Sequence, residues 1–77
     1  RTEILFDISV QDHATLKLYN IKGQEVITLI NKVLNPGLHK VTWNGVNNNG
    51  KELSSGMYFY ELVVGDISLR KKLVLLK

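Results

Sequence analysis

Apolar and polar residues alternate along much of the chain, as they do in strands that bury only one face. Every second residue over 4–8 is apolar, and in the segment 15–19 Leu16 and Leu18 fall on the inner side with Lys17 on the outer side. Val, Ile, Thr, Leu, Tyr and Phe dominate such segments, while Gly and Asn separate them. This pattern predicts an all-β chain.

The segment 25–34 is ambiguous, because its apolar positions fit helical spacing nearly as well as a strand. Val26, Ile27, Thr28 and Ile30 are β-branched, and such side chains favour extended backbone. Strand-like segments also lie on both sides of it. We therefore predict a strand here.

Turns are expected between these strands, at residues 12–13, 20–23, 35–37 and 65–66. Pro36 presets φ for the second position of a type II turn, and Gly37 accepts the positive φ of the third, so the chain should reverse there. Gly65 stands at the first central position of a two-residue connection, which predicts a type II′ hairpin.

The segment 39–43 is predicted to be a strand that buries Val41 and Trp43 and leaves Lys40 in solvent. Trp43 is the expected core anchor.

A long connection over 44–56 comes next, in which Leu53 is the expected apolar contact with the core. Two long strands, 57–64 and 67–76, complete the chain. Six or seven strands at a spacing of roughly 8–12 residues predict an antiparallel β-sandwich.

Length and composition limit the possibilities further. With 77 residues the chain forms one domain, since a chain of this size buries only about 60% of its unfolded surface. It has no cysteine, which excludes a disulfide framework and a thiolate zinc site. The net charge of +3 is spread along the chain, so no nucleic-acid partner is expected. The longest apolar run, LVLL at 73–76, is far shorter than the about 20 residues of a membrane-spanning helix.

The chain begins at Arg1, without an initiator methionine, and alternation starts at Ile4. We therefore expect residues 1–77 to be a piece of a longer chain, with any signal peptide lying upstream.

Catalytic groups do not converge in the sequence. His13 and His39 are 26 positions apart, without metal-ligand spacing. They are expected to be a turn residue and a surface imidazole. Ser54-Ser55-Gly56 lacks the G-x-S-x-G context of a nucleophile. No enzyme and no cofactor is predicted.

The asparagine-rich loop resembles the calcium-loop template only in part. Asn47 and Asn49 occupy ligand positions, but Gly45 and Gly56 stand where the two charged ligands belong. We predict no metal site, and interpret the loop as a run of Asx turns that tolerate left-handed backbone.

Two clusters have a structural and a functional interpretation. Tyr58-Phe59-Tyr60 could stack on sugars, but core packing is favoured, with a tyrosine hydroxyl reaching solvent or a backbone partner. Arg70-Lys71-Lys72 lies on a predicted strand, where its side chains alternate between faces and protect an edge from aggregation.

Four segments together resemble a known family. They are LKLYNIKGQEV at 16–26, NPGLHKVTWNG at 35–45, NNNGKELSSGMYFYELVVGD at 47–66 and KKLVLLK at 71–77. They resemble the C-terminal sorting domain of type IX secretion cargo proteins, which implies an Ig-like β-sandwich. The residues that match its structural motif are Pro36, Gly37, Trp43, Gly45, Gly50 and Gly65. Many relatives carry Asp where this chain has Asn44 and Asn47.

The resemblance implies that residues 1–77 are a non-catalytic address label and the C-terminal piece of a larger secreted protein. Its partners would be an outer-membrane secretion translocon, a sortase-like peptidase and an upstream cargo domain in the same parent chain. The cargo would pass through the periplasm and be secreted or attached to the cell surface. The residues proposed for translocon recognition lie in the last hairpin: Gly56, Tyr58, Tyr60, Leu62, Lys71, Lys72, Leu73, Leu75 and Lys77.

The same strands also resemble the Ig-like domain of the flagellar hook-capping protein. That resemblance implies a structural spacer or docking module of a surface protein or hydrolase. A third possibility, carbohydrate binding, requires Trp43 or Tyr60 to be exposed.

Overall fold

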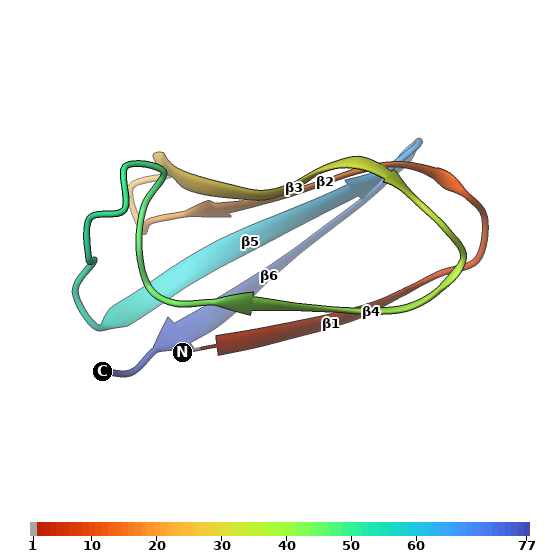
Figure 1. Ribbon diagram of the computed structural model, residues 1–77. Coiled ribbons are helices and arrows are strands. Elements are labelled where there is room, and N and C mark those ends of the chain that lie inside the picture. Colours follow the sequence, from red (N-terminus) through yellow and green to blue (C-terminus); the bar gives the residue numbers. More distant parts are fainter. Residues whose placement is uncertain (1) are drawn as a thin grey trace.

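Six strands in two antiparallel sheets make up the computed structural model, which describes residues 2–77 (Figure 1). The strands are β1 (Thr2–Ile8), β2 (Asp12–Tyr19), β3 (Glu25–Leu34), β4 (Gly37–Trp43), β5 (Gly56–Val64) and β6 (Ile67–Leu75). The smaller sheet pairs β1 with β4, and the larger has the order β3-β2-β5-β6. The described residues contain no helix, and the predicted all-β sandwich of six to seven strands is confirmed.

The core lies between the two sheets, where alternate residues of facing strands meet. In β1 the inward residues Ile4, Phe6 and Ile8 are buried, and in β2 Leu16 and Leu18 are fully buried, as their alternation predicts. Val41 is half-buried and Lys40 exposed, also as expected.

Trp43 is the core anchor that the sequence predicts, with 1% of its surface exposed. Its indole N–H donates to the carbonyl of Val46 (2.9 Å), and its ring meets Tyr58 edge to face at 5.1 Å between centroids. The Tyr58 hydroxyl donates to the carbonyl of Ser54 (2.7 Å). Both large rings are therefore buried with their polar atoms paired, which avoids the cost of an unsatisfied donor.

β3 is a strand, as predicted, but two irregularities interrupt its pairing with β2. Leu16 pairs with Ile30 and Lys17 with Thr28, so Leu29 is an extra residue. A second extra residue, Val26, lies between the next pairs. Each bulge shifts the alternation by one residue. These shifts explain why the apolar positions of this segment resemble helical spacing.

The turn predicted at Asp12 and His13 is wrong. Both residues belong to β2 and pair with the end of β3, and the connection from β1 lies at residues 9–11. The His13 side chain hydrogen-bonds the Asn31 side chain (2.8 Å), and the His13 carbonyl accepts from the Gly65 N–H (3.2 Å). Contacts with distant segments thus extend the strand through two residues with a local turn preference.

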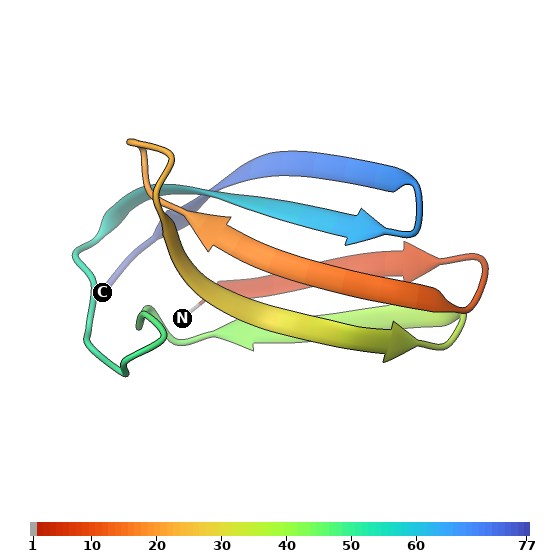
Figure 2. The ribbon, with the colours of Figure 1, turned by 90° about the horizontal axis from the view of Figure 1, so that it is seen from above.

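The predicted turns at 20–23 and 65–66 are present. The side chain of Asn20 closes the turn at 20–23 by accepting from the N–H groups of Lys22 and Gln24. Gly65 has φ 57°, and no described residue other than glycine has a positive φ, as a type II′ turn requires. At 35–37 the chain reverses as predicted and also crosses between sheets, because β3 and β4 belong to different layers (Figure 2). The predicted type II turn is not found there, since Gly37 already belongs to β4 and its φ of 126° is far from the roughly 80° of the third position of such a turn.

The long connection between β4 and β5 is ordered by its own side chains. The Asn47 side chain accepts from the N–H groups of Asn49 and Lys51, both at 3.0 Å, which confirms an Asx turn. Left-handed backbone occurs at Gly45 and Gly50 and not at the asparagines, which corrects that part of the prediction. Leu53 packs against the core as expected.

Candidate functional site

The two sheets differ in width, and this difference leaves one side of the sandwich open. Seen from above, β5 and β6 extend beyond β1 (Figure 2). A groove of about 570 Å³ lies between β1 and this overhanging hairpin. We call it the β1–β6 groove; its main lining residues are Phe6 and Ile8 of β1, Tyr60, Leu62 and Val64 of β5, and Ile67, Leu69 and Lys71 of β6.

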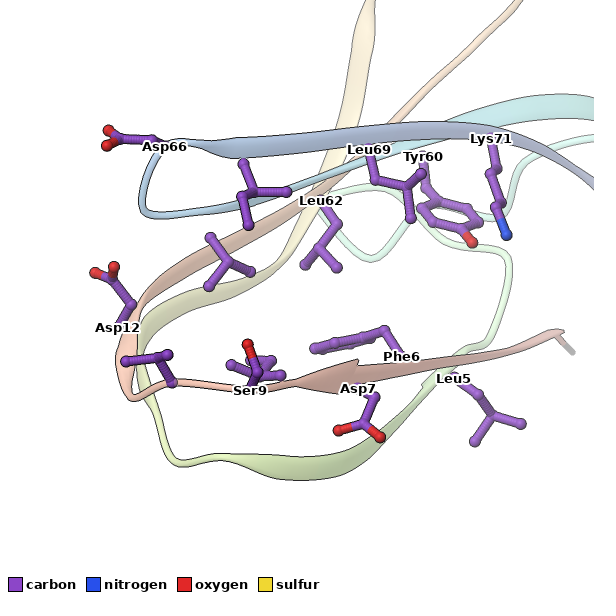
Figure 3. Close-up of a pocket in the computed structure, with 14 residues that line it drawn as sticks. Leu5, Phe6, Asp7, Ser9, Asp12, Tyr60, Leu62, Asp66, Leu69 and Lys71 are labelled. Atoms are coloured by element: carbon purple, nitrogen blue, oxygen red, sulfur yellow. The ribbon is translucent and has the colours of Figure 1, made fainter.

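The walls of the groove are mainly apolar. Phe6 and Leu62 form its buried inner side, and Tyr60 is half-buried (Figure 3). Toward the open side, Leu69 is 40% exposed and Ile67 is 71% exposed, although both are inward-facing residues of β6. Large apolar side chains left in solvent together are a mark of an interaction surface.

Charges are distributed unevenly along the groove. Asp12 and Asp66 lie together at the end where the β5–β6 turn approaches the start of β2, whereas Lys71 lies beside Tyr60 further along (Figure 3). Asp7 also lines the groove, but its side chain points away from the β5–β6 hairpin (Figure 3). The ion pairs among residues 2–77 are Lys17–Glu25, Lys40–Glu3 and Lys77–Glu52, and none includes these four groove residues. The Asp12 carboxylate accepts a hydrogen bond from the His13 N–H (2.7 Å).

Both strands that border the groove are edge strands. Within residues 2–77, β1 pairs only with β4, and β6 pairs only with β5. A strand paired on one side directs about half of its N–H and C=O groups to the other side. The groove therefore combines apolar walls with unpaired backbone groups.

The groove's acidic end is held by a close contact. The Gly65 N–H donates to the His13 carbonyl, and a Cβ placed at Gly65 would collide with the Asp12 carboxylate. A Cβ at residue 65 would therefore displace the exposed Asp12 carboxylate, and the φ of 57° also favours glycine at this position.

The residues proposed for translocon recognition are divided among several places. Tyr60, Leu62 and Lys71 line the groove. Tyr58, Leu73 and Leu75 are buried in the core away from the groove, so an outside partner cannot reach these side chains in the folded state. Lys72 is exposed opposite Phe59, on the outer face. Gly56 begins β5, and the Lys77 ammonium pairs with Glu52 at 3.5 Å.

The motif glycines and proline occupy turns, loops and a strand start. Pro36 lies between β3 and β4, Gly37 begins β4, Gly50 lies in the long connection, and Gly65 is in the last hairpin. Gly45 packs against Leu75 and Lys77, whose side-chain atoms would be 3.1 Å from an added Cβ.

Sequence reasoning missed the groove residues Phe6, Ile67, Leu69, Asp12 and Asp66. Alternation indicates that Ile67 and Leu69 face inward, but it does not indicate whether another strand covers them. No sequence pattern indicates this, because only the strand order of the structure shows that β1 and β6 each have a neighbouring strand on one side alone within residues 2–77.

The outer face of the larger sheet carries the other two basic residues of the triplet. Arg70 lies over the rings of Tyr19 and Phe59, at 5.3 and 5.8 Å from their centroids. Lys71 points to the opposite face, so the predicted alternation of this triplet on an edge strand is confirmed.

The histidines make structural contacts. His39 stacks on Phe6 at 5.5 Å and hydrogen-bonds the Asn35 carbonyl (2.7 Å), while His13 contacts Asn31. Within residues 2–77, no group of three or more His, Asp or Glu side chains is arranged to hold a metal ion. No helix long and apolar enough to cross a membrane is found in this part of the chain.

The order of the strands, two facing four around a buried tryptophan, defines an Ig-like β-sandwich. The sequence model of the FlgD Ig-like domain family matches residues 6–66, which is most of the chain. The chain belongs to this family, whose domains are generally non-catalytic structural modules. No curated protein and no solved structure matches the chain. The match agrees with the hook-capping resemblance, and the type IX resemblance stays a prediction.

Proposed function

We propose that this chain is a non-catalytic docking module that holds other protein segments in place. The observation that carries the proposal is its membership of the FlgD Ig-like domain family together with the open β1–β6 groove. Apolar walls, free strand edges and unpaired charges are features of a protein-binding surface. Docking is one of the two roles, spacer or docking module, that the resemblance to the hook-capping Ig-like domain implies.

Docking is favoured over a spacer role by the positions of the start of β1 and the end of β6, which lie side by side. Thr2 and Val74 are 72 positions apart, yet the Thr2 hydroxyl donates to the Val74 carbonyl (3.5 Å). A spacer holds its two neighbouring domains apart. A domain whose first and last strands meet at one end adds little length between its neighbours.

A sorting label is the second candidate, supported by the basic edge strand. β6 is exposed along one side and carries Arg70, Lys71 and Lys72 in succession. Because Tyr58, Leu73 and Leu75 are buried away from the groove, a translocon would recognise the groove residues Tyr60 and Leu62, the lysines and the β6 backbone. In this case the domain would direct its cargo through the outer membrane toward the cell surface.

One experiment separates these functions. Residues 1–77 are fused behind a signal peptide and a monomeric fluorescent protein, in a bacterium with a type IX system and in a translocon-deficient strain. Docking predicts that short-range cross-linking attaches a defined protein to the fusion, in both strains, and not to the fluorescent protein alone. Surface fluorescence that disappears in the deficient strain supports the sorting label instead. No specific cross-link and no change of location would refute both functions.

A further inference from the structure

We propose that the β1–β6 groove binds an extended strand of a separate partner protein. The partner strand pairs with the free edge of β1 and becomes the third strand of the smaller sheet. The inference rests on the proposed docking function, because it specifies the surface and the chemistry of the partner.

Strand spacing places the partner in the groove. Neighbouring strands in a sheet lie about 4.8 Å apart, so a strand added beside β1 lies beneath the overhanging β5–β6 hairpin. Its side chains on one face then point at Tyr60, Leu62 and Leu69. The completed sandwich has seven strands, three facing four, which is the strand number of the common Ig-like domain.

β1 is the favoured edge because of its composition. The strand TEILFDI contains no lysine, arginine or proline, and Leu5 is 58% exposed. β6, by contrast, has three basic residues in a row, which discourage pairing at that edge. A peptide that uses the groove therefore pairs with β1 and covers the inner face of β6.

The apolar walls determine the inner face of the partner. Ile67 and Leu69 occupy successive inward positions of β6, and both retain much of their exposure. Two apolar side chains at alternate positions of the partner strand would cover them. Burial of such side chains is the main favourable term in the association.

The charged residues of the groove determine where the partner strand needs charges of its own. Lys71 is four residues after Ile67, about 13 Å along the strand, and Asp12 and Asp66 lie at the opposite end. β1 runs toward this acidic end, since Ile8 and Asp12 are close in sequence. A strand antiparallel to β1 thus needs a basic residue near its N-terminus and an acidic residue six positions later, both on the inner face.

The probe is the blocked peptide Lys-Thr-Val-Thr-Val-Thr-Glu, added to the isotope-labelled 77-residue chain. Amide exchange and chemical shifts are monitored by NMR. We expect saturable binding that slows exchange at alternate residues of β1, with no new protection of the β6 backbone. A peptide with both valines replaced by asparagine is the control for apolar contact and should not bind.

Variants of the chain test the groove directly. Ile67→Asp should weaken binding about tenfold or more, because it removes an apolar wall and adds a charge. Ser68→Asp is the matched control, since it adds the same charge to the next residue on the other face, and it should bind nearly as the parent does. Lys71→Glu should weaken binding roughly two- to fivefold, and a peptide ending in lysine should restore it. Thermal unfolding of each variant checks its folding.

Several outcomes would overturn the inference. Slower amide exchange along β6 would show that the peptide pairs with β6 and not with β1. Equal peptide affinity of the Ile67→Asp variant and the parent chain would show that the groove does not take part in binding. Protection of β1 without peptide, increasing with protein concentration, would identify a second copy as the occupant. If the peptide fails to bind while the fusion still cross-links a specific protein, the docking function stands and only this surface is wrong.

Discussion

The two halves of β6 have the same alternating pattern but opposite environments. In the first half the inward residues Ile67 and Leu69 are 71% and 40% exposed, whereas in the second half Leu73 and Leu75 are 8% and 0% exposed. The second half is covered: Gly45 of the long connection packs on Leu75, and Tyr58 beside Leu73 contacts Trp43. Nothing among the described residues covers the first half in the same way. The alternation of apolar residues therefore determines which side chains of β6 point inward, and the opposite sheet and loops determine whether those side chains are buried.

Truncating one leucine in each half tests this difference most strongly. Leu75→Ala should lower the free energy of unfolding by about 2–5 kcal/mol, because it leaves a cavity in a closed core. Leu69→Ala, which removes a partly exposed side chain, should cost less than about 1.5 kcal/mol. Urea denaturation of both variants measures the contrast. Equal losses would mean that the groove closes in solution.

A methyl group at Gly65 tests how the acidic end of the groove is held. Gly65→Ala should destabilise the chain by about 1–2 kcal/mol, because φ is 57° and the added Cβ meets Asp12. Gly23→Ala is the matched control, since Gly23 also has a positive φ but has open space around it. The double variant Gly65→Ala with Asp12→Ala should recover the excess loss. The same loss at both glycines would show that the contact with Asp12 contributes nothing.

Removing a hydroxyl from the closed half should have a smaller effect. Tyr58→Phe eliminates the hydrogen bond to the Ser54 carbonyl but keeps the ring against Trp43, so we expect a loss of about 0.5–1.5 kcal/mol. Tyr60→Phe is the comparison, because the hydrogen bonds of the described residues include none from the Tyr60 hydroxyl. Thermal unfolding compares them, and a larger loss at Tyr60 would contradict the expectation.

The smallest effect is expected in the open half. Lys71→Ala should change the free energy of unfolding by no more than about 0.5 kcal/mol, because the ammonium is exposed and has no ion pair among residues 2–77. Urea midpoints at low and high salt provide the measurement. A clear, salt-dependent loss would show that Lys71 stabilises the fold and is not reserved for a partner.

The sequence predicts most of the fold because its strands have clear alternation and strong turns. Leu16 and Leu18, Trp43 and the Gly65-Asp66 turn are all found where local rules place them. Local rules fail at Asp12 and His13, since pairing with β3 and the hydrogen bond from the Gly65 N–H prevail over their turn preference. They also fail to show the bulges at Val26 and Leu29, because a bulge is defined by the partner strand.

The candidate site is harder to predict, since it depends on sheet width. Tyr60, Leu62 and Lys71 were proposed from a motif, and they meet in the groove. Tyr58, Leu73 and Leu75 belong to the same motif but stabilise the core. Phe6 and Asp12 come from segments that the motif does not include, and only the three-dimensional arrangement brings them to the same surface.

The meeting of Thr2 and Val74 at one end of the sandwich also determines how the domain responds to tension. A pull on residues beside Thr2 loads the Thr2–Trp43 pair first, and a pull beyond Leu75 loads the Gly56–Leu75 pair first. Each strand then opens like a zipper, one residue pair at a time, because the load is never shared along its whole length. Force applied between the two chain ends should therefore unravel this domain easily, whereas force along the strands, applied at opposite ends, would meet much greater resistance.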